Sequence, residues 1–184
     1  FFVYDLKDIM LGAEVNFKYT NIVRNIVFEY LYTKYQSGPV YHDHTYSVAD
    51  HVAGQDNYYN HNIYPGWQHW GQVMGNPLYL SPIYNDNGSI RIMNNRFIAF
   101  HLGVDGCPFK DFTYRVLATY EQGFGTYEMP YLSPKNSVSL LLECGYSFVH
   151  DWHVMCGLGA DSGSILGNNY GIQLTISKKG LLGK

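Results

Sequence analysis

The sequence of 184 residues is poor in charged residues and contains no long apolar run. Asp, Glu, Lys and Arg make up 15% of it, whereas a typical soluble domain has about 25%. No apolar run approaches the roughly 20 residues of a transmembrane helix. The net charge of -3 offers no electrostatic basis for binding nucleic acid. Three widely spaced cysteines form neither a zinc pattern nor a dense disulfide framework.

Aromatic residues are abundant instead. They reach 17% of the sequence, and 18 residues are Tyr. Transmembrane β-barrels combine low charge with many aromatics, because Tyr and Trp occupy the two membrane–water interfaces. A Tyr-rich binding surface on a soluble domain fits the same composition, so composition alone leaves both classes open.

Alternation of apolar with polar or small residues is the main structural signal. In the segment after Ser137 the even positions are Val138, Leu140 and Leu142, and the odd positions include Ser139 and Glu143. The same pattern predicts strands over 12–19, 24–36, 96–104, 112–124, 137–148, 152–161 and 170–177. We expect a short turn at 105–108, a longer Pro-containing loop at 125–136 and a tight turn at 149–151.

The lengths of these strands favour a membrane wall. About eleven residues at roughly 3.3 Å each, tilted by about 45°, span some 26 Å, which matches the apolar band of an outer-membrane barrel. The alternative is a soluble β-sandwich with the apolar face as its core, but soluble strands usually have about five or six residues. The predicted fold is therefore all-β, an antiparallel transmembrane β-barrel of which this chain supplies about seven or eight strands.

The segment 37–72 interrupts the alternation with a polar and aromatic insertion rich in Tyr, His and Trp. Long segments without periodicity are usually functional or disordered, and this composition indicates an ordered, functional one. We describe the chain as a single barrel segment, 1–184, that carries this insertion.

Several motifs follow one another in a familiar order. They are Gly66-Trp67-Gln68-His69-Trp70-Gly71-Gln72, Met74-Gly75-Asn76-Pro77-Leu78, Ser81-Pro82-Ile83-Tyr84-Asn85, Asn95-Arg96-Phe97, His101-Leu102-Gly103, Tyr114-Arg115, Gly125-Thr126-Tyr127 and Ser164-Ile165-Leu166-Gly167-Asn168-Asn169-Tyr170-Gly171. From about residue 24 to 180 the chain resembles the Wzi-type capsule assembly proteins in their Bacteroidetes-like form. The resemblance implies a large outer-membrane barrel that attaches capsular or exopolysaccharide to the cell surface without catalysis. Because that family has many more strands, we expect this chain to be a C-terminal portion.

The densest chemical cluster lies in the insertion. Sugar rings stack on Tyr and Trp faces, while His, Asn and Gln hydrogen-bond sugar hydroxyls. The candidate glycan-binding residues are His42, His44, Tyr58, Tyr59, His61, Trp67, His69 and Trp70. The alternative is a plug packed into the barrel. The pair His42-x-His44 shares one strand face and suits zinc or copper, but no further ligands are specified, so no metal site is predicted.

The predicted interior face carries charged and titratable residues. They are Glu29, Arg96, His101, Arg115, Glu121, Glu143 and Asp161. The favoured interpretation is that these side chains pair with one another between strands. The alternative is that they line a polar path for a solute. On the other face, a hairpin centred on His150 places Cys144 opposite Cys156. Opposed residues have Cβ atoms about 4.5–5.5 Å apart, whereas a disulfide needs about 3.8 Å, so we predict adjacent, unbonded thiols.

The predicted function is a non-enzymatic barrel of the bacterial outer membrane that binds or anchors surface polysaccharide. No spacing selects a nucleophile and base, so no catalytic residue and no cofactor are predicted. The partners expected are surface polysaccharide and outer-membrane lipid, with other outer-membrane proteins as further candidates. A passive pore or a structural subunit of a larger outer-membrane complex is the alternative, and a lipid-modifying barrel enzyme is a third possibility.

Overall fold

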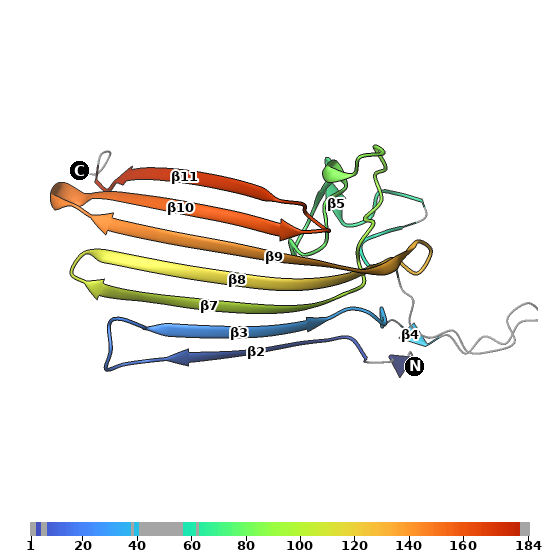
Figure 1. Cartoon of the computed structure of the whole chain (residues 1–184), viewed down its shortest axis with the longest axis horizontal. Helices are drawn as coiled ribbons and strands as arrows, with labels where there is room; N and C mark the ends of the chain where they lie inside the picture. The colour runs from blue at the N-terminus through green and yellow to red at the C-terminus, as the bar shows by residue number, and fades with distance from the viewer. Residues whose placement is uncertain (1–2, 5–6, 38, 41–56, 62, 181–184) are drawn as a thin grey trace, which may run out of the picture. The chain divides into compact units, whose positions relative to one another are not determined.

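The computed structural model describes residues 3–4, 7–37, 39–40, 57–61 and 63–180. One antiparallel sheet of seven strands dominates, in the order β11-β10-β9-β8-β7-β3-β2 (Figure 1). Its strands are β2 (Ile9–Asn16), β3 (Asn25–Tyr32), β7 (Phe97–Phe109), β8 (Phe112–Gly125), β9 (Pro130–Ser147), β10 (Trp152–Gly163) and β11 (Asn169–Lys178). The short elements are β1 (Val3–Tyr4), β4 (Pro39–Val40), β5 (Gln68–His69), β6 (Gln72–Val73) and the 3-10 helices η1 (Pro82–Tyr84) and η2 (Val149–Asp151).

The predicted all-β, antiparallel class is confirmed, and the seven strands of the main sheet agree with the seven or eight predicted. Within the residues described, β2 and β11 are the two edges and the sheet is not closed into a barrel. The described part of the chain contains no helix long and apolar enough to cross a membrane.

The chain divides into two compact units. The insertion unit comprises 1–10, 31–99 and 121–135, and the strand unit comprises 11–30, 100–120 and 136–184. The insertion unit contains most of the residues between β3 and β7, and the strand unit contains the regular pairing of β9, β10 and β11.

In the strand unit, β9 and β10 pair around the turn at η2. Their register places His153 opposite Ser147 and Cys156 opposite Cys144. The predicted centre of the hairpin at residue 150 is therefore confirmed. Both cysteine thiols are free, as predicted. This register determines which side chains lie on each face of the sheet, because a slip by one residue would move every side chain of a strand to the other face.

Odd-numbered residues of β3 and β7–β11 share one face of the strand unit. The site of a Cβ on Gly103 lies within 3.7 Å of both Val27 and Leu117, and the site of one on Gly157 lies within 3.8 Å of Glu143 and Gln173. In the same unit Arg115 pairs with Glu143 across β8 and β9. We call this face, which continues onto the even residues of β2, the polar face.

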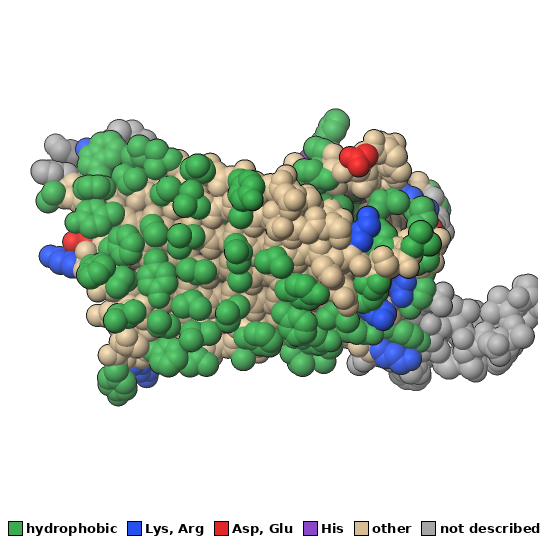
Figure 2. Space-filling view, in the orientation of Figure 1, with side chains coloured by type: hydrophobic (Ala, Val, Ile, Leu, Met, Phe, Trp, Pro, Cys, Tyr) green, Lys and Arg blue, Asp and Glu red, His purple; other side chains and the backbone are tan. Residues whose placement is uncertain are grey.

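The opposite surface of the strand unit, here called the apolar face, carries the even residues of β3 and β7–β11 and the odd residues of β2. Between 11 and 178 the only charged residue on these strands at an apolar-face position is Lys178, at the end of β11. Figure 2 shows the hydrophobic side chains spread along the strands. Exposed examples are Phe100, Leu102, Val116, Leu140, Leu142, Leu158, Ile172, Leu174 and Ile176.

The predicted turn at 105–108 is wrong, because β7 continues to Phe109. The chain reverses at Lys110 and Asp111 instead, where Asp111 has a left-handed φ of 64°. Gly106 serves close packing: a Cβ there would lie 1.9 Å from the carbonyl oxygen of Ile22. The glycine in this segment therefore signals a close approach of two backbones and not a turn.

The predicted loop at 125–136 is also wrong, because β9 begins at Pro130 and only 126–129 lie outside a strand. The prolines are tolerated for a geometric reason. The register of β9 with β10 ends at Ser137, so Pro130 and Pro134 have no β10 partner that would require their missing N–H groups.

The insertion unit holds the four buried hydrophobic residues found in the described chain: Tyr79, Ile92, Phe97 and Ala99. Tyr79 stacks on Tyr59 with ring centroids 4.1 Å apart and meets Phe97 edge-on at 5.0 Å. Burial, with a smaller contribution from Tyr59, raises the pKa of Tyr79 above its ordinary value. The segment before β7 thus packs on odd residues of β7, and it extends to Arg96, beyond the predicted end at Gln72.

Candidate functional site

A two-residue hairpin presents the most exposed tryptophan. In β5 and β6, Gln68 pairs with Val73 and His69 with Gln72. The turn residues Trp70 and Gly71 have φ of 51° and 76°, as a type I′ turn requires. Such a conformation is common for Gly but is an outlier for a bulky residue. Trp70 is 87% exposed. Its left-handed backbone conformation is strained for a bulky residue, and it places the indole ring in solvent.

Side-chain amides hold the rest of the insertion in place of regular secondary structure. Asn60 both donates to the carbonyl of Ile92 and accepts from its N–H, each at 2.9 Å. Asn85 donates to the carbonyls of Ser89 and Arg91, and Gln68 donates to the carbonyl of Ile90. These bonds satisfy backbone groups that have no ladder partner, which explains how a segment without periodicity becomes ordered.

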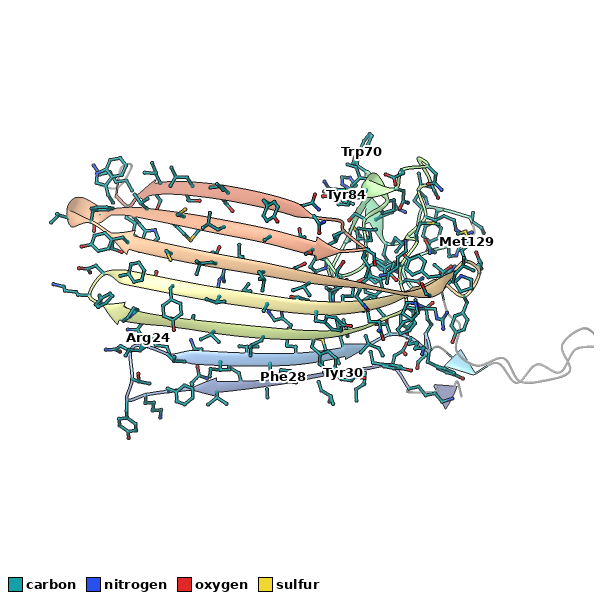
Figure 3. All side chains as sticks on the ribbon, viewed as in Figure 1. Arg24, Phe28, Tyr30, Trp70, Tyr84 and Met129 are labelled. Atoms are coloured by element: carbon teal, nitrogen blue, oxygen red, sulfur yellow. The ribbon has the colours of Figure 1, made fainter. Side chains whose placement is uncertain are left out.

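An open hollow of about 610 Å³ lies beside the hairpin. Trp70 and His69 border it on one side, with ring centroids 6.2 Å apart and nearly perpendicular planes. Ile83, from η1, and Asn85 border it as well. In Figure 3 Trp70 and Tyr84 project from the same region of the insertion. The hollow therefore combines apolar ring faces with amide groups, a lining suited to a ligand that has both C–H faces and hydroxyls.

The structure separates the predicted glycan-binding residues into groups. His69 and Trp70 line the hollow, and the nearby Trp67 is 65% exposed. Tyr58 and Tyr59 face the interior of the insertion unit instead: the Tyr58 hydroxyl donates to the carbonyl of Ser37, and Tyr59 stacks on Tyr79. His42 and His44 lie outside the described residues.

His61 belongs to a second, smaller hollow of about 360 Å³. Its ring stacks on Tyr64 at 3.9 Å, and its Nδ1 accepts a hydrogen bond from the N–H of Ile63. Arg91 lines the same hollow and pairs with Glu128 at 2.9 Å. Both hollows include Pro65 and Ile90 in their linings, so they are neighbours on one surface.

Sequence reasoning missed the residues that the insertion contributes after Gln72. They include four residues with large side chains that line the two hollows, Ile83, Asn85, Ile90 and Arg91. An available signal was the continued lack of strand alternation between Val73 and Arg96, together with the Ser81-Pro82 and Asn87-Gly88 turn dipeptides. Extending the insertion to the first residue of β7 would have included all four.

The residues predicted for the interior face are partly paired. In the strand unit, Arg115 pairs with Glu143 and His101 contacts the hydroxyl of Thr119 at 2.7 Å. Glu29 and Asp161 are half-buried there.

The insertion unit contains the other two. Glu121 is 4% exposed and accepts a hydrogen bond of 2.7 Å from Asn94. The Arg96 guanidinium lies 3.9 Å from the centre of the Tyr127 ring and donates to the carbonyl of Lys34. Among the residues that the structure describes, no group of three His, Cys, Asp or Glu side chains is arranged to hold a metal ion.

Comparison with known proteins identified no relative of this chain. No family model matches the chain, and no curated protein or solved structure matches it either. The resemblance to capsule assembly proteins therefore stays a prediction.

Proposed function

We propose that this chain forms part of the wall of an outer-membrane β-barrel that binds surface polysaccharide without catalysis. One observation carries the membrane part of the proposal. On the strands that the structure describes, the apolar face runs across seven strands with Lys178 as its only charged residue, while the opposite face carries the ion pair Arg115–Glu143 and glycines. A lipid-facing wall with a polar interior has this distribution.

A water-soluble role explains the apolar face less well. Soluble monomers rarely expose apolar patches larger than a few hundred Å². Here Tyr170 and Ile172 are 88% and 81% exposed, and Leu174 is 64% exposed. The strands from β7 to β11 have 10 to 18 residues, lengths that cross an apolar band of about 25 Å even when tilted.

The two edge strands of the sheet, β2 and β11, need pairing partners if the sheet lies in lipid. An open edge leaves backbone N–H and C=O groups unpaired, and each unpaired group is costly where no water is present. All residues of β2 are exposed, and so are those of β11 apart from Thr175. We propose that further strands pair with β2 and β11 and that the closed barrel is larger than this sheet.

The hollow beside Trp70 is the proposed glycan site. The exposed indole offers a flat face for the C–H groups of a sugar ring. The His69 ring offers polar atoms for sugar hydroxyls, and the side-chain oxygen of Asn85 offers an acceptor, because the NH2 group of Asn85 already donates to Ser89 and Arg91.

The test is retention of capsular polysaccharide by the purified protein. Trp70→Ala and Trp67→Ala should each weaken retention about tenfold, the value of losing about 1.4 kcal/mol of contact. Trp70→Asn should weaken it as much, although Asn tolerates the left-handed turn and preserves the hairpin. The matched control is Trp152→Phe, in the strand unit, which should leave retention unchanged.

Two results would contradict the proposal. Equal retention by the wild type and by both Trp70 variants would assign the indole to packing. Failure to retain any capsular glycan from the host, combined with ion conductance in planar bilayers, would favour the passive pore.

A further inference from the structure

Aromatic and lysine side chains gather at the end of the strand unit where β7 meets β8 and β9 meets β10. Tyr146 and Phe148 are 43% and 51% exposed and meet edge-on at 4.8 Å. Phe109, in the neighbouring hairpin, is 72% exposed. Trp152 follows η2 and is 42% exposed. Aromatic rings at one end of a lipid-facing wall are typical of the membrane–water interface.

Lys178 occupies an informative position in this cluster. It is the only charged residue of the apolar face, and it stands in the last position of β11. Its Nζ lies 5.3 Å from the centre of the Trp152 ring, within reach of a cation–π interaction. The ammonium group is thereby held at the aromatic rim, where a lysine can extend toward a headgroup while its stem stays against apolar surface.

A hollow of about 800 Å³ opens at the same end of the unit. Lys110 and Lys179 line it, together with the hydroxyl-bearing Ser147 and Ser177. Ammonium and hydroxyl groups are the donors that phosphate oxygens accept from. The acidic residues of this lining, Asp111 and Asp151, balance Lys110 and Lys179. Lys178 lies outside the lining, between Ser177 and Lys179 in the sequence, and adds one positive charge at this end of the unit.

We infer that this end of the wall binds the phosphate headgroup of an anionic phospholipid, with Lys178 beside Trp152 and with Lys110 and Lys179 as the contacting cations. The inference rests on the proposed membrane location of the apolar face. It goes beyond that location because it assigns a lipid class and three residues. The turns β7–β8 and β9–β10 are short, with two and four residues outside the strands, which is typical of the periplasmic side of such barrels.

Quenching of Trp152 by brominated lipid tests the inference. The full chain, with Trp67→Phe and Trp70→Phe, keeps Trp152 as its single indole. It is reconstituted in vesicles of phosphatidylcholine with a fixed minor fraction of phosphatidylglycerol, and either one lipid or the other is brominated on its acyl chains. We expect phosphatidylglycerol to be enriched about twofold or more beside Trp152, because each lysine near a membrane attracts anionic lipid.

Removing the lysines gives the decisive comparison. With Lys110, Lys178 and Lys179 all replaced by Gln, the enrichment should disappear. Lys135→Gln, in the insertion unit, is the matched control and should leave it intact. Equal enrichment in the wild type and the triple variant, or none in the wild type, would overturn the inference while leaving Trp152 in the bilayer. Absence of quenching by either brominated lipid would overturn the membrane proposal itself.

Discussion

At the scale of single residues, the insertion unit is held by buried polar groups more than by apolar ones. Thr33, Gln36, Asn94, Asn95 and Glu121 are all less than 5% exposed. The Gln36 amide donates to the carbonyl of Asn95, and the Thr33 hydroxyl accepts from the N–H of Phe97. Because a buried polar group without a partner destabilises a fold, such a network specifies one arrangement strongly.

Glu121 provides a direct test of this network. Its carboxylate accepts from the side-chain NH2 of Asn94, and the side-chain oxygen of Asn94 accepts from the N–H of Gly125. Glu121→Ala should lower the free energy of unfolding by about 1–3 kcal/mol, because it leaves the Asn94 amide buried without its acceptor. Glu121→Gln keeps an acceptor oxygen and should destabilise less. Urea unfolding in detergent micelles measures both, and equal losses in the two variants would contradict this role for the oxygen.

At the scale of elements, glycines determine how closely neighbouring segments approach. A Cβ on Gly106 would lie 1.9 Å from the Ile22 carbonyl oxygen and 2.8 Å from the Tyr114 ring. Gly171, in β11, has no neighbouring atom within 4 Å of its Cβ site. The two residues therefore form a matched pair in the strand unit, with the same chemical change and opposite surroundings.

We predict opposite outcomes for the two alanine substitutions. Gly106→Ala should destabilise the chain by about 1–3 kcal/mol, the range for added volume in a packed site. Gly171→Ala should be neutral or slightly stabilising, because alanine restricts the unfolded chain. Thermal unfolding followed by circular dichroism distinguishes them. Similar stability for both variants would refute the close approach of Ile22 to β7.

The strands were predictable because their signal is local. The polarity of each residue in a strand indicates which face of the sheet that residue occupies. The alternation around Leu140 or Ile172 therefore predicted a strand without knowledge of its partner. The hairpin register of β9 and β10 followed from a single centre of symmetry at residue 150. The turn at 105–108 was mispredicted because Gly106 and Pro108 occur in turns and in strands for different reasons, and only the position of Ile22 distinguishes them.

The insertion was not predictable in the same way. Its bonds join residues far apart in sequence, such as Asn60 with Ile92 and Gln36 with Asn95. No period reveals such pairs. Sequence composition did identify the segment as aromatic and polar, and His69 and Trp70 do meet at a hollow. It could not indicate that Tyr58 and Tyr59 pack inward, because a Tyr suits a core and a binding surface equally.

At the scale of the whole molecule, we propose that the apolar face of the strand unit meets lipid. Alternate residues of one strand must then have different surroundings: Leu140 and Leu142 face acyl chains, and Leu141 and Glu143 face the polar side. This contact with lipid depends neither on the identity of the glycan nor on the number of closing strands.

Spin labels along β9 test directly whether the apolar face meets lipid. Single cysteines at 139 to 143, placed in turn in a chain whose Cys107, Cys144 and Cys156 are changed to Ser, carry the label in lipid vesicles. We predict that collision with oxygen, which concentrates in lipid, is highest at 140 and 142, and that collision with a water-soluble nickel chelate is highest at 139, 141 and 143. Collision rates without this two-residue alternation, or with its phase reversed, would contradict the assignment of the apolar face to lipid.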